Sequence, residues 1–326
     1  MSAVVNFVRS NGAVRKIGGA VLTLLGVAII VFIMLRAIPG NQITAGLGTE
    51  AAALTPAQQE ALKRYYGLDQ PLVVQFFSWL GNLFTGNLGY SARNQDSVLD
   101  LTAKALPVTA ELAIFSILLA LAIGIPLGML SASARQGVGA VLSKVVGLAG
   151  LSVPAFLLAT SMLSLSASNW GFNPNGKPFA ALWVDPGLNL QQLLMPALVL
   201  GFGIAAPIMR TTTTAVLEVR SQDFVRTARA KGVPPRRLAV RHVLGNALVP
   251  IVTMTGLQFG YLLGGAVVVE QIFSIPGIGR QVLLGIQQKE YALVQSTVLV
   301  IALAFVVVNL LTDLLYRAID PRVRAR

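Results

Sequence analysis

Few residues of this chain have the types and spacing that nucleotide, metal or covalent chemistry requires. Residues 171–177 fit the spacing G-x-x-x-x-G-K of a phosphate-binding loop, but Pro178 stands where Ser or Thr would hold magnesium, and no strand is expected before it. With one histidine, His242, and no cysteine, a zinc site of the usual type is unsupported. No Ser-His-acid or H-E-x-x-H arrangement is present. We therefore expect a chain that binds no cofactor and catalyses nothing by itself.

Three acidic residues, Glu111, Glu270 and Asp313, lie at or near the ends of apolar runs. Acids inside a bilayer are costly and frequently functional. A proton relay needs an acid nearer the middle of a span, and none of the apolar runs contains one. This argues against a proton-coupled carrier.

The elements that position these residues are membrane spans. Hydrophobic residues make up 55% of the 326 residues and charged residues 12%, against roughly 25% in soluble domains. The net charge is nevertheless +12, a combination typical of a polytopic membrane protein with basic inner loops rather than a nucleic-acid binder. Six charge-free runs are long enough to cross a bilayer, which takes about 20 residues. They are residues 17–35, 112–134, 145–167, 188–209, 248–269 and 291–312.

The distribution of Lys and Arg predicts the orientation. Most of the 25 basic residues fall in the two termini and in the connections after the second and fourth spans. By the positive-inside rule, both termini and the 210–247 loop lie in the cytoplasm. Residues 36–111 then form a large external loop, in which 73–83 is predicted to be an interfacial helix with its aromatic residues at headgroup level.

The 210–247 loop contains a basic segment, 223–241, with the pattern of a folded structure. If residues 223–231 form a helix, Phe224, Thr227 and Ala228 share one face, Gly232 ends the helix, and Pro234 and Pro235 prevent its continuation. Small residues on that face would let a partner approach closely. The alternative is a basic loop that lies against anionic lipid. The candidate docking residues are Asp223, Phe224, Arg226, Thr227, Ala228, Arg229, Ala230, Lys231 and Gly232.

Two glycine patterns indicate close packing or a gate. Gly256, Gly260 and Gly264 recur every four residues in the fifth span, which predicts helix packing within the chain or, alternatively, a face toward a partner or the solute pathway. After that span, Pro276, Gly277 and Gly279 interrupt a short apolar stretch, which we interpret as an external loop or gate.

These motifs, in order, resemble the inner-membrane permease subunits of bacterial peptide ABC importers, and the resemblance runs nearly end to end. The wider importer signature has Glu-Ala-Ala ahead of the loop glycine, whereas this chain has Arg226-Thr227-Ala228, a departure usual in the peptide branch. The matching stretches are 35–40, 67–72, 86–91, 152–154, 224–232, 241–242, 246–248 with Pro250, 270–273, 276–279 and the C-terminal positions Asn309, Asp313, Tyr316 and 320–322.

The resemblance implies an all-α fold with six transmembrane helices in the type I importer architecture, forming one permease domain over residues 1–326. It also implies partners: a second homologous permease, two ATPase subunits that hold ATP and magnesium, and an extracytoplasmic substrate-binding protein. The 223–241 segment would then be the coupling element toward the ATPases. The alternatives are an ion-gradient-driven secondary transporter and, in another class, a membrane-embedded hydrolase or assembly scaffold. The solute class stays open among dipeptides, longer peptides, glutathione-like compounds and nickel chelates.

Overall fold

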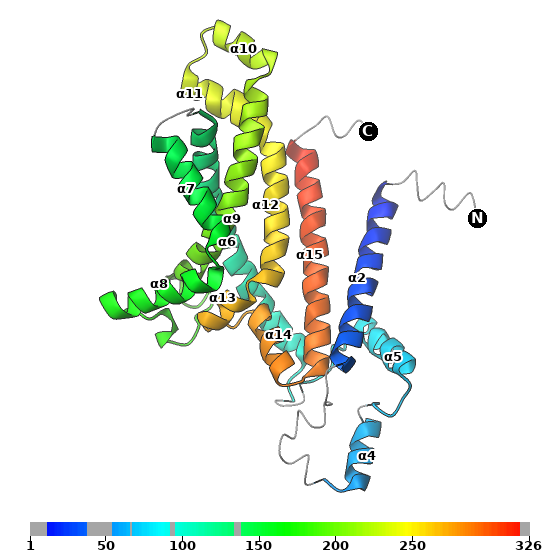
Figure 1. The fold of residues 1–326 in the computed structure, drawn as a ribbon. Helices are drawn as coiled ribbons and strands as arrows, with labels where there is room; N and C mark the ends of the chain where they lie inside the picture. Colours follow the sequence, from blue (N-terminus) through cyan, green and yellow to red (C-terminus); the bar gives the residue numbers. More distant parts are fainter. Residues whose placement is uncertain (1–11, 38–53, 66, 92–94, 134–137, 320–326) are drawn as a thin grey trace, which may run out of the picture. The chain divides into compact units, whose positions relative to one another are not determined.

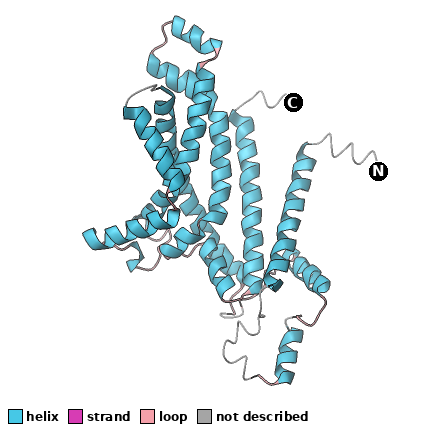
Figure 2. Cartoon of the chain, viewed as in Figure 1, coloured by secondary structure: helices cyan, strands magenta, loops and turns pink. Residues whose placement is uncertain are grey.

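The described part of the chain is helical. The computed structural model describes residues 12–37, 54–65, 67–91, 95–133 and 138–319, and within them the only extended pairing is an isolated bridge between Tyr90 and Ser97 (Figure 2). Five helices of these ranges are long and apolar enough to cross a membrane. The longest helices are α2 (Gly12–Ala37), α6 (Val98–Ser133), α9 (Pro186–Arg220), α12 (Gly245–Gly265) and α15 (Tyr291–Ile319) (Figure 1).

The third predicted span, 145–167, is two shorter helices. They are α7 (Val138–Ser152) and α8 (Ala155–Trp170), separated at Val153 and Pro154. Pro154 has extended backbone angles, φ −60° and ψ 136°, and its ring restricts the residue before it. Proline alone does not decide such a break, because α6 and α9 each contain two prolines in their interiors.

The fourth predicted span is longer than expected. Helix α9 continues to Arg220, so residues 210–220, which we assigned to the cytoplasmic loop, are helical. The charge-free run ends just before Arg210. A helix is held by backbone hydrogen bonds, however, and does not require apolar side chains. In this part of α9 the hydroxyls of Thr212 and Thr213 donate to the backbone carbonyls of Ile208 and Met209, one turn back. The predicted external loop is also structured, since 36–111 contains α4 (Pro56–Tyr65), α5 (Leu72–Phe84) and the first turns of α6.

Contacts divide the chain into two compact units. The first unit comprises Met1–Leu106 and Arg280–Val306, and the second comprises Pro107–Gly279 and Val307–Arg326. The assignment of the whole chain to one permease domain stays a prediction.

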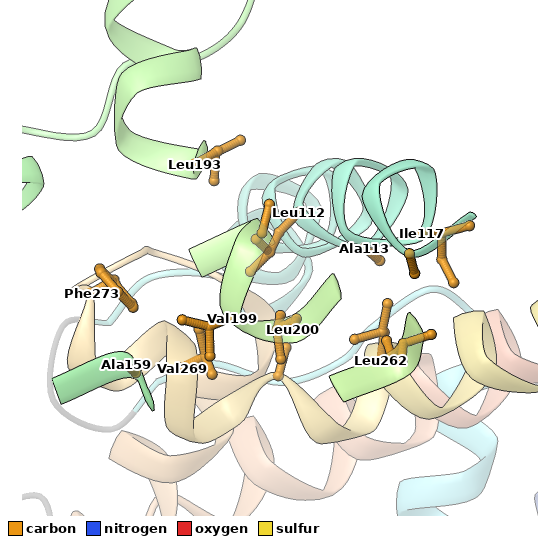
Figure 3. Close-up of a cluster of buried hydrophobic side chains, with 14 of the residues drawn as sticks. Leu112, Ala113, Ile117, Ala159, Leu193, Val199, Leu200, Leu262, Val269 and Phe273 are labelled. Atoms are coloured by element: carbon orange, nitrogen blue, oxygen red, sulfur yellow. The ribbon is translucent and has the colours of Figure 1, made fainter. Parts of the chain in front are cut away.

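The second unit is organised around α9. In the most apolar 18-residue stretch of α9, 67% is buried, which is the largest share among the five long helices. Its core joins side chains from α6, α8, α9, α12 and α13 (Val267–Ile272), among them Leu112, Leu193 and Leu262, each at most 1% exposed (Figure 3). A helix that is apolar on several faces is typical of the centre of a bundle.

Glycines allow α6 to approach α9 closely. A Cβ placed on Gly128 of α6 would lie 2.6 Å from Cβ of Thr212 and 2.8 Å from the carbonyl oxygen of Met209, both on α9. About three turns along the same pair of helices, a Cβ on Gly201 of α9 would lie 2.9 Å from the carbonyl oxygen of Ser116. Small residues at such crossings permit backbone contact in a membrane, where burial of apolar surface contributes little to association.

The first unit contains an aromatic cluster between α2 and α5. The Phe32 ring packs edge-on against Phe76, with centroids 5.2 Å apart, and stacks on Trp79 at 6.1 Å. Trp79 is only 9% exposed, whereas Phe77 is 63% exposed. Two of the aromatics that we assigned to the headgroup level, Phe76 and Trp79, therefore pack against Phe32 of α2. Arg36 completes the contact, with its guanidinium 3.4 Å from the Phe32 centroid and its Nη2 donating to Oε1 of Gln75 at 3.0 Å.

The α6–α9 crossing generates a stability prediction. Gly128→Ala should lower the thermal unfolding midpoint of the detergent-purified protein, because the added methyl group meets backbone that cannot move aside; overpacking costs roughly 1–3 kcal/mol. Gly26→Ala is the matched control, since a Cβ at Gly26 of α2 meets nothing within 4 Å. Equal midpoints for the two variants would show that the crossing is not tightly packed.

Candidate functional site

The candidate site is the segment that connects α9 to α12, which we name the docking elbow (Ser221–Leu244). Helix α9 ends where the Ser221 hydroxyl and backbone N–H both donate to the Glu218 carbonyl, at 2.7 and 3.2 Å. Gln222 then takes extended angles, and α10 (Asp223–Ala230) begins. Asp223 in the first turn complements the partial positive charge of the helix N-terminus. Its 3.6 Å pairing with Arg226 is solvent-exposed and adds little stability.

Helix α10 ends as the sequence predicts. Gly232 has φ +75°, its N–H donates to the Arg229 carbonyl at 3.0 Å, and the Val233 N–H donates to the Ala228 carbonyl at 3.2 Å. This hydrogen-bond pair is the Schellman arrangement, in which a residue with positive φ closes the helix. Only glycine adopts that conformation without strain, so Gly232 is required by geometry.

The second half of the elbow, residues Pro235–Leu244, turns the chain back toward α12, and we name it the return limb. Pro235 begins the single turn α11 (Pro235–Arg237), and the π-helix η3 (Leu238–Leu244) joins it to α12. Figure 1 shows α10 and α11 beyond the end of α9, where α12 begins its course alongside that helix. The elbow is thus a helical hairpin mounted on two long helices.

A small apolar core holds the elbow in place. Val225 of α10 is 1% exposed and packs with Leu238 and Val243 of η3. The same cluster includes Val216 and Val219 of α9. Because both limbs contribute buried side chains, α10 has one defined orientation relative to α9 and α12.

The outward face of α10 is partly as predicted. Phe224 is 40% exposed, and Thr227 is exposed as well. Ala228 is half-buried against the elbow core, because it lies one turn after Val225 as well as one turn after Phe224. The accessible face is therefore centred on Phe224 and Thr227 rather than on Ala228.

Cations surround this face. The basic side chains of the elbow all point into solvent, while Arg220, just before it, reaches back to α6 and donates to the Ala132 carbonyl at 2.9 Å. Arg220 was not among our candidates, and only its position at the end of a helix could have indicated a carbonyl partner. The exposed cations are Arg226, Arg229, Lys231, Arg236, Arg237 and Arg241.

The other predicted site residues lie elsewhere in the second unit. Gly256 of α12 is buried against α15, where a Cβ would overlap the Thr312 side chain; Gly260 is buried, and Gly264 is exposed with free space around it. The three glycines therefore do not form one uniform packing stripe. Pro276 and Gly277 lie in the turn between α13 and α14 (Ile278–Gln287), and Gly279 is the second residue of α14. This segment is separate from the elbow in sequence and lies beside Glu270.

The near-match to a phosphate-binding loop is a structural turn. Residues Pro174–Gly176 form one turn of 3₁₀ helix, whose Asn175 N–H donates to Oδ1 of Asn173 at 2.9 Å. The Asn175 side chain donates to the Ile272 carbonyl at 3.2 Å. The described residues contain no group of three or more His, Asp or Glu side chains that could hold a metal ion.

The sequence matches two family models that together cover most of its length. Residues 124–325 match the binding-protein-dependent transport system inner membrane component, and residues 11–113 match the N-terminal part of binding-protein-dependent transport system membrane components.

Relatives in sequence and a solved structure of similar fold accompany this match. A putative peptide permease protein of Brucella ovis is 38% identical over 92% of this chain and 95% of its own length. The glutathione transport system permease protein GsiC of Escherichia coli K12 is 35% identical over 96% of this chain and 99% of its own. Among solved structures, the inward-facing MetNI methionine ABC transporter shares the fold with a TM-score of 0.53, at 18% identity, over 68% of this chain and 96% of that chain.

The match over more than half of the chain, the extent of these similarities and the bundle of long apolar helices agree: the chain belongs to the binding-protein-dependent transport system inner membrane component family and is a multi-pass membrane permease subunit of an ABC importer.

Proposed function

We propose that this chain is one of a pair of permeases that move peptides or similar small amide-containing solutes inward across the bacterial inner membrane. Its partners are a second homologous permease, two ATPase subunits that bind ATP and magnesium, and an external substrate-binding protein. The observation that carries the proposal is the docking elbow: an exposed Phe224 on a short cationic helix, held rigidly by its own buried core. The names of the relatives, for peptide and glutathione transport, support a solute with peptide bonds.

The elbow can transmit force because it is rigid and because it is continuous with the spans. An ATPase groove that closes around Phe224 and Thr227 moves α10, and the buried contacts of Val225 oblige α9 and α12 to follow. Such movement of packed helices between two arrangements is the usual way in which membrane transporters convert partner closure into access to one side. The same exposed cations would bind anionic lipid headgroups in the alternative interpretation.

One prediction concerns docking. Phe224→Ala should reduce co-purification of the ATPase subunits and abolish most uptake, while the amount of permease in the membrane stays normal. An aromatic anchor at an interface contributes about 2 kcal/mol or more, which is about thirtyfold in affinity.

Arg237→Ala is the control for docking. It removes one exposed charge from the return limb and leaves α10 intact. Normal uptake by Phe224→Ala together with loss of uptake by Arg237→Ala would assign the elbow to lipid binding.

The next prediction concerns orientation, which the excess of basic residues in the termini and the elbow supports. The chain has no native cysteine, so single cysteines report without background. Lys177→Cys, in an exposed external turn, should react with a membrane-impermeant maleimide on intact cells, and Arg236→Cys should react only after permeabilisation. Labelling in the opposite pattern would refute the proposed orientation.

The energy source separates this proposal from a secondary transporter. Uptake should stop when cellular ATP is depleted with the ion gradient maintained, and it should continue when the gradient is collapsed with ATP present. The purified single chain should hydrolyse no ATP, whereas the assembled complex should. Uptake that follows the gradient instead would favour the secondary transporter.

A further inference from the structure

A fully buried carboxyl group lies at the far end of α12 from the docking elbow. Glu270 belongs to α13, which follows α12 after Ala266, and its side chain is 0% exposed. A buried charged group is costly unless its surroundings satisfy it. The groups around it show which part of the chain depends on it.

Thr109 of α6 contacts both Glu270 and the segment that follows α13. Its hydroxyl donates to Oε1 of Glu270 at 2.6 Å and accepts from the backbone N–H of Ile278 at 2.8 Å. Ile278 is the first residue of α14 (Ile278–Gln287), so its N–H has no partner inside that helix. Thr109 of α6 therefore caps the N-terminus of α14, which is distant from it in sequence, and Glu270 orients the Thr109 hydroxyl.

Residues Phe273–Gly277 form the tight turn between α13 and α14, which we name the outer turn, and it folds over the carboxyl group. The Ile275 N–H donates to the Glu270 carbonyl at 2.9 Å, and the Gly277 N–H donates to the Ile275 carbonyl at 2.8 Å. A Cβ on Gly277 would overlap the Glu270 carboxyl group, and one on Gly279 would lie 3.1 Å from its Oε2. Gly277 has no positive φ, so its lack of a side chain matters for space alone.

The outer turn is covalently continuous with the docking elbow. The elbow leads into α12, whose 21 residues span about 31 Å at 1.5 Å per residue, and α12 leads through Ala266 and α13 to the turn. All of these residues, with Thr109, belong to the second compact unit.

We infer that Glu270 and Thr109 are positioning residues that hold the outer turn against α6. Docking of a substrate-binding protein at the external surface is thereby transmitted to α12 and the elbow. This inference rests on the proposed function, in which a substrate-binding protein arrives from outside. Without the pair, the turn retains its sequence but loses its fixed place on α6, and the external event no longer reaches the ATPases.

The test uses the complete complex in lipid nanodiscs and two variants of Thr109. Thr109→Val keeps the shape but removes both hydrogen bonds, and Thr109→Ser keeps the hydroxyl. Basal ATP hydrolysis should be unchanged in both variants. Stimulation by the binding protein, purified with its bound solute, should fall about tenfold in the Val variant, which is the effect expected when one buried donor, the Ile278 N–H, loses its partner. Stimulation should be preserved in the Ser variant. A merely structural defect would lower basal and stimulated rates together.

Ser116→Ala is the matched control, because Ser116 is a fully buried hydroxyl on the same helix that bonds only to the Leu112 carbonyl of its own helix, at 2.7 Å. It should leave stimulation intact. If Thr109→Val prevents assembly, Gly277→Ala is the second variant: it displaces the carboxyl group by sterics and leaves Thr109 in place, and it should lose stimulation as well.

A spin label reports on the turn without any need for transport. At Ser274→Cys, an exposed position in the turn, the label should give a broad, immobilised spectrum in the Thr109 background and a narrower, mobile one with Thr109→Val. An unchanged spectrum, or a mobile turn with full stimulation, overturns the inference. If the native complex itself shows no stimulation by the binding protein, the proposed function fails, while the label still decides whether Thr109 holds the turn.

Discussion

The close approach of α6 to α9 is the contact on which the second unit depends. At Gly128 and at Gly201 the two helices are so close that an added methyl group would overlap a carbonyl oxygen of the neighbouring helix. In a bilayer, dispersion between closely packed helices replaces much of the hydrophobic driving force that operates in water. Because α9 is the helix most deeply buried in its neighbours, its placement determines where α12 and the docking elbow lie.

Two neighbouring residues of α10 face opposite ways and have different roles. Val225 faces inward and fixes the orientation of α10, while Phe224, its neighbour in sequence, faces outward and is available to a partner. The exposed cations of the elbow favour its hydration. Because buried contacts join α10 to α9, little of a displacement of α10 would be absorbed within the elbow.

Local patterns in the sequence predicted the elements whose causes are local. The charge-free runs located the long helices, and Gly232 with Pro234 predicted the end of α10, because a positive φ and a missing N–H act within a few residues. The break at Pro154 was missed because the surrounding run is uniformly apolar. The continuation of α9 through Arg220 was missed because polarity was taken as the end of a helix.

Contacts between distant segments could not be predicted in this way. Glu270 attracted attention as an acid near a span end, but Thr109 lies 161 residues away and carries no local signal. Likewise, the partial burial of Ala228 depends on the return limb, where Leu238 and Val243 complete a core that α10 alone does not contain. Side-chain roles that depend on such pairings require the three-dimensional arrangement.

The π-helical stretch η3 has a consequence for how the chain length can vary. Leu238–Leu244 accommodates more residues per turn than an α-helix, so it acts as a local surplus of chain within an otherwise continuous helical limb. Loss of one residue there would be taken up by a return to α-helical winding, because closing each turn on the fifth rather than the fourth residue is what accommodates the surplus residue. Gly256 would then keep roughly its present phase against Thr312. The same deletion inside α12 would instead turn everything that follows by about 100° about the helix axis, with a shift of about 1.5 Å. The phase of the fifth span is thus buffered at the end nearest the docking elbow, where the chain tolerates a change in length better than it does within the span.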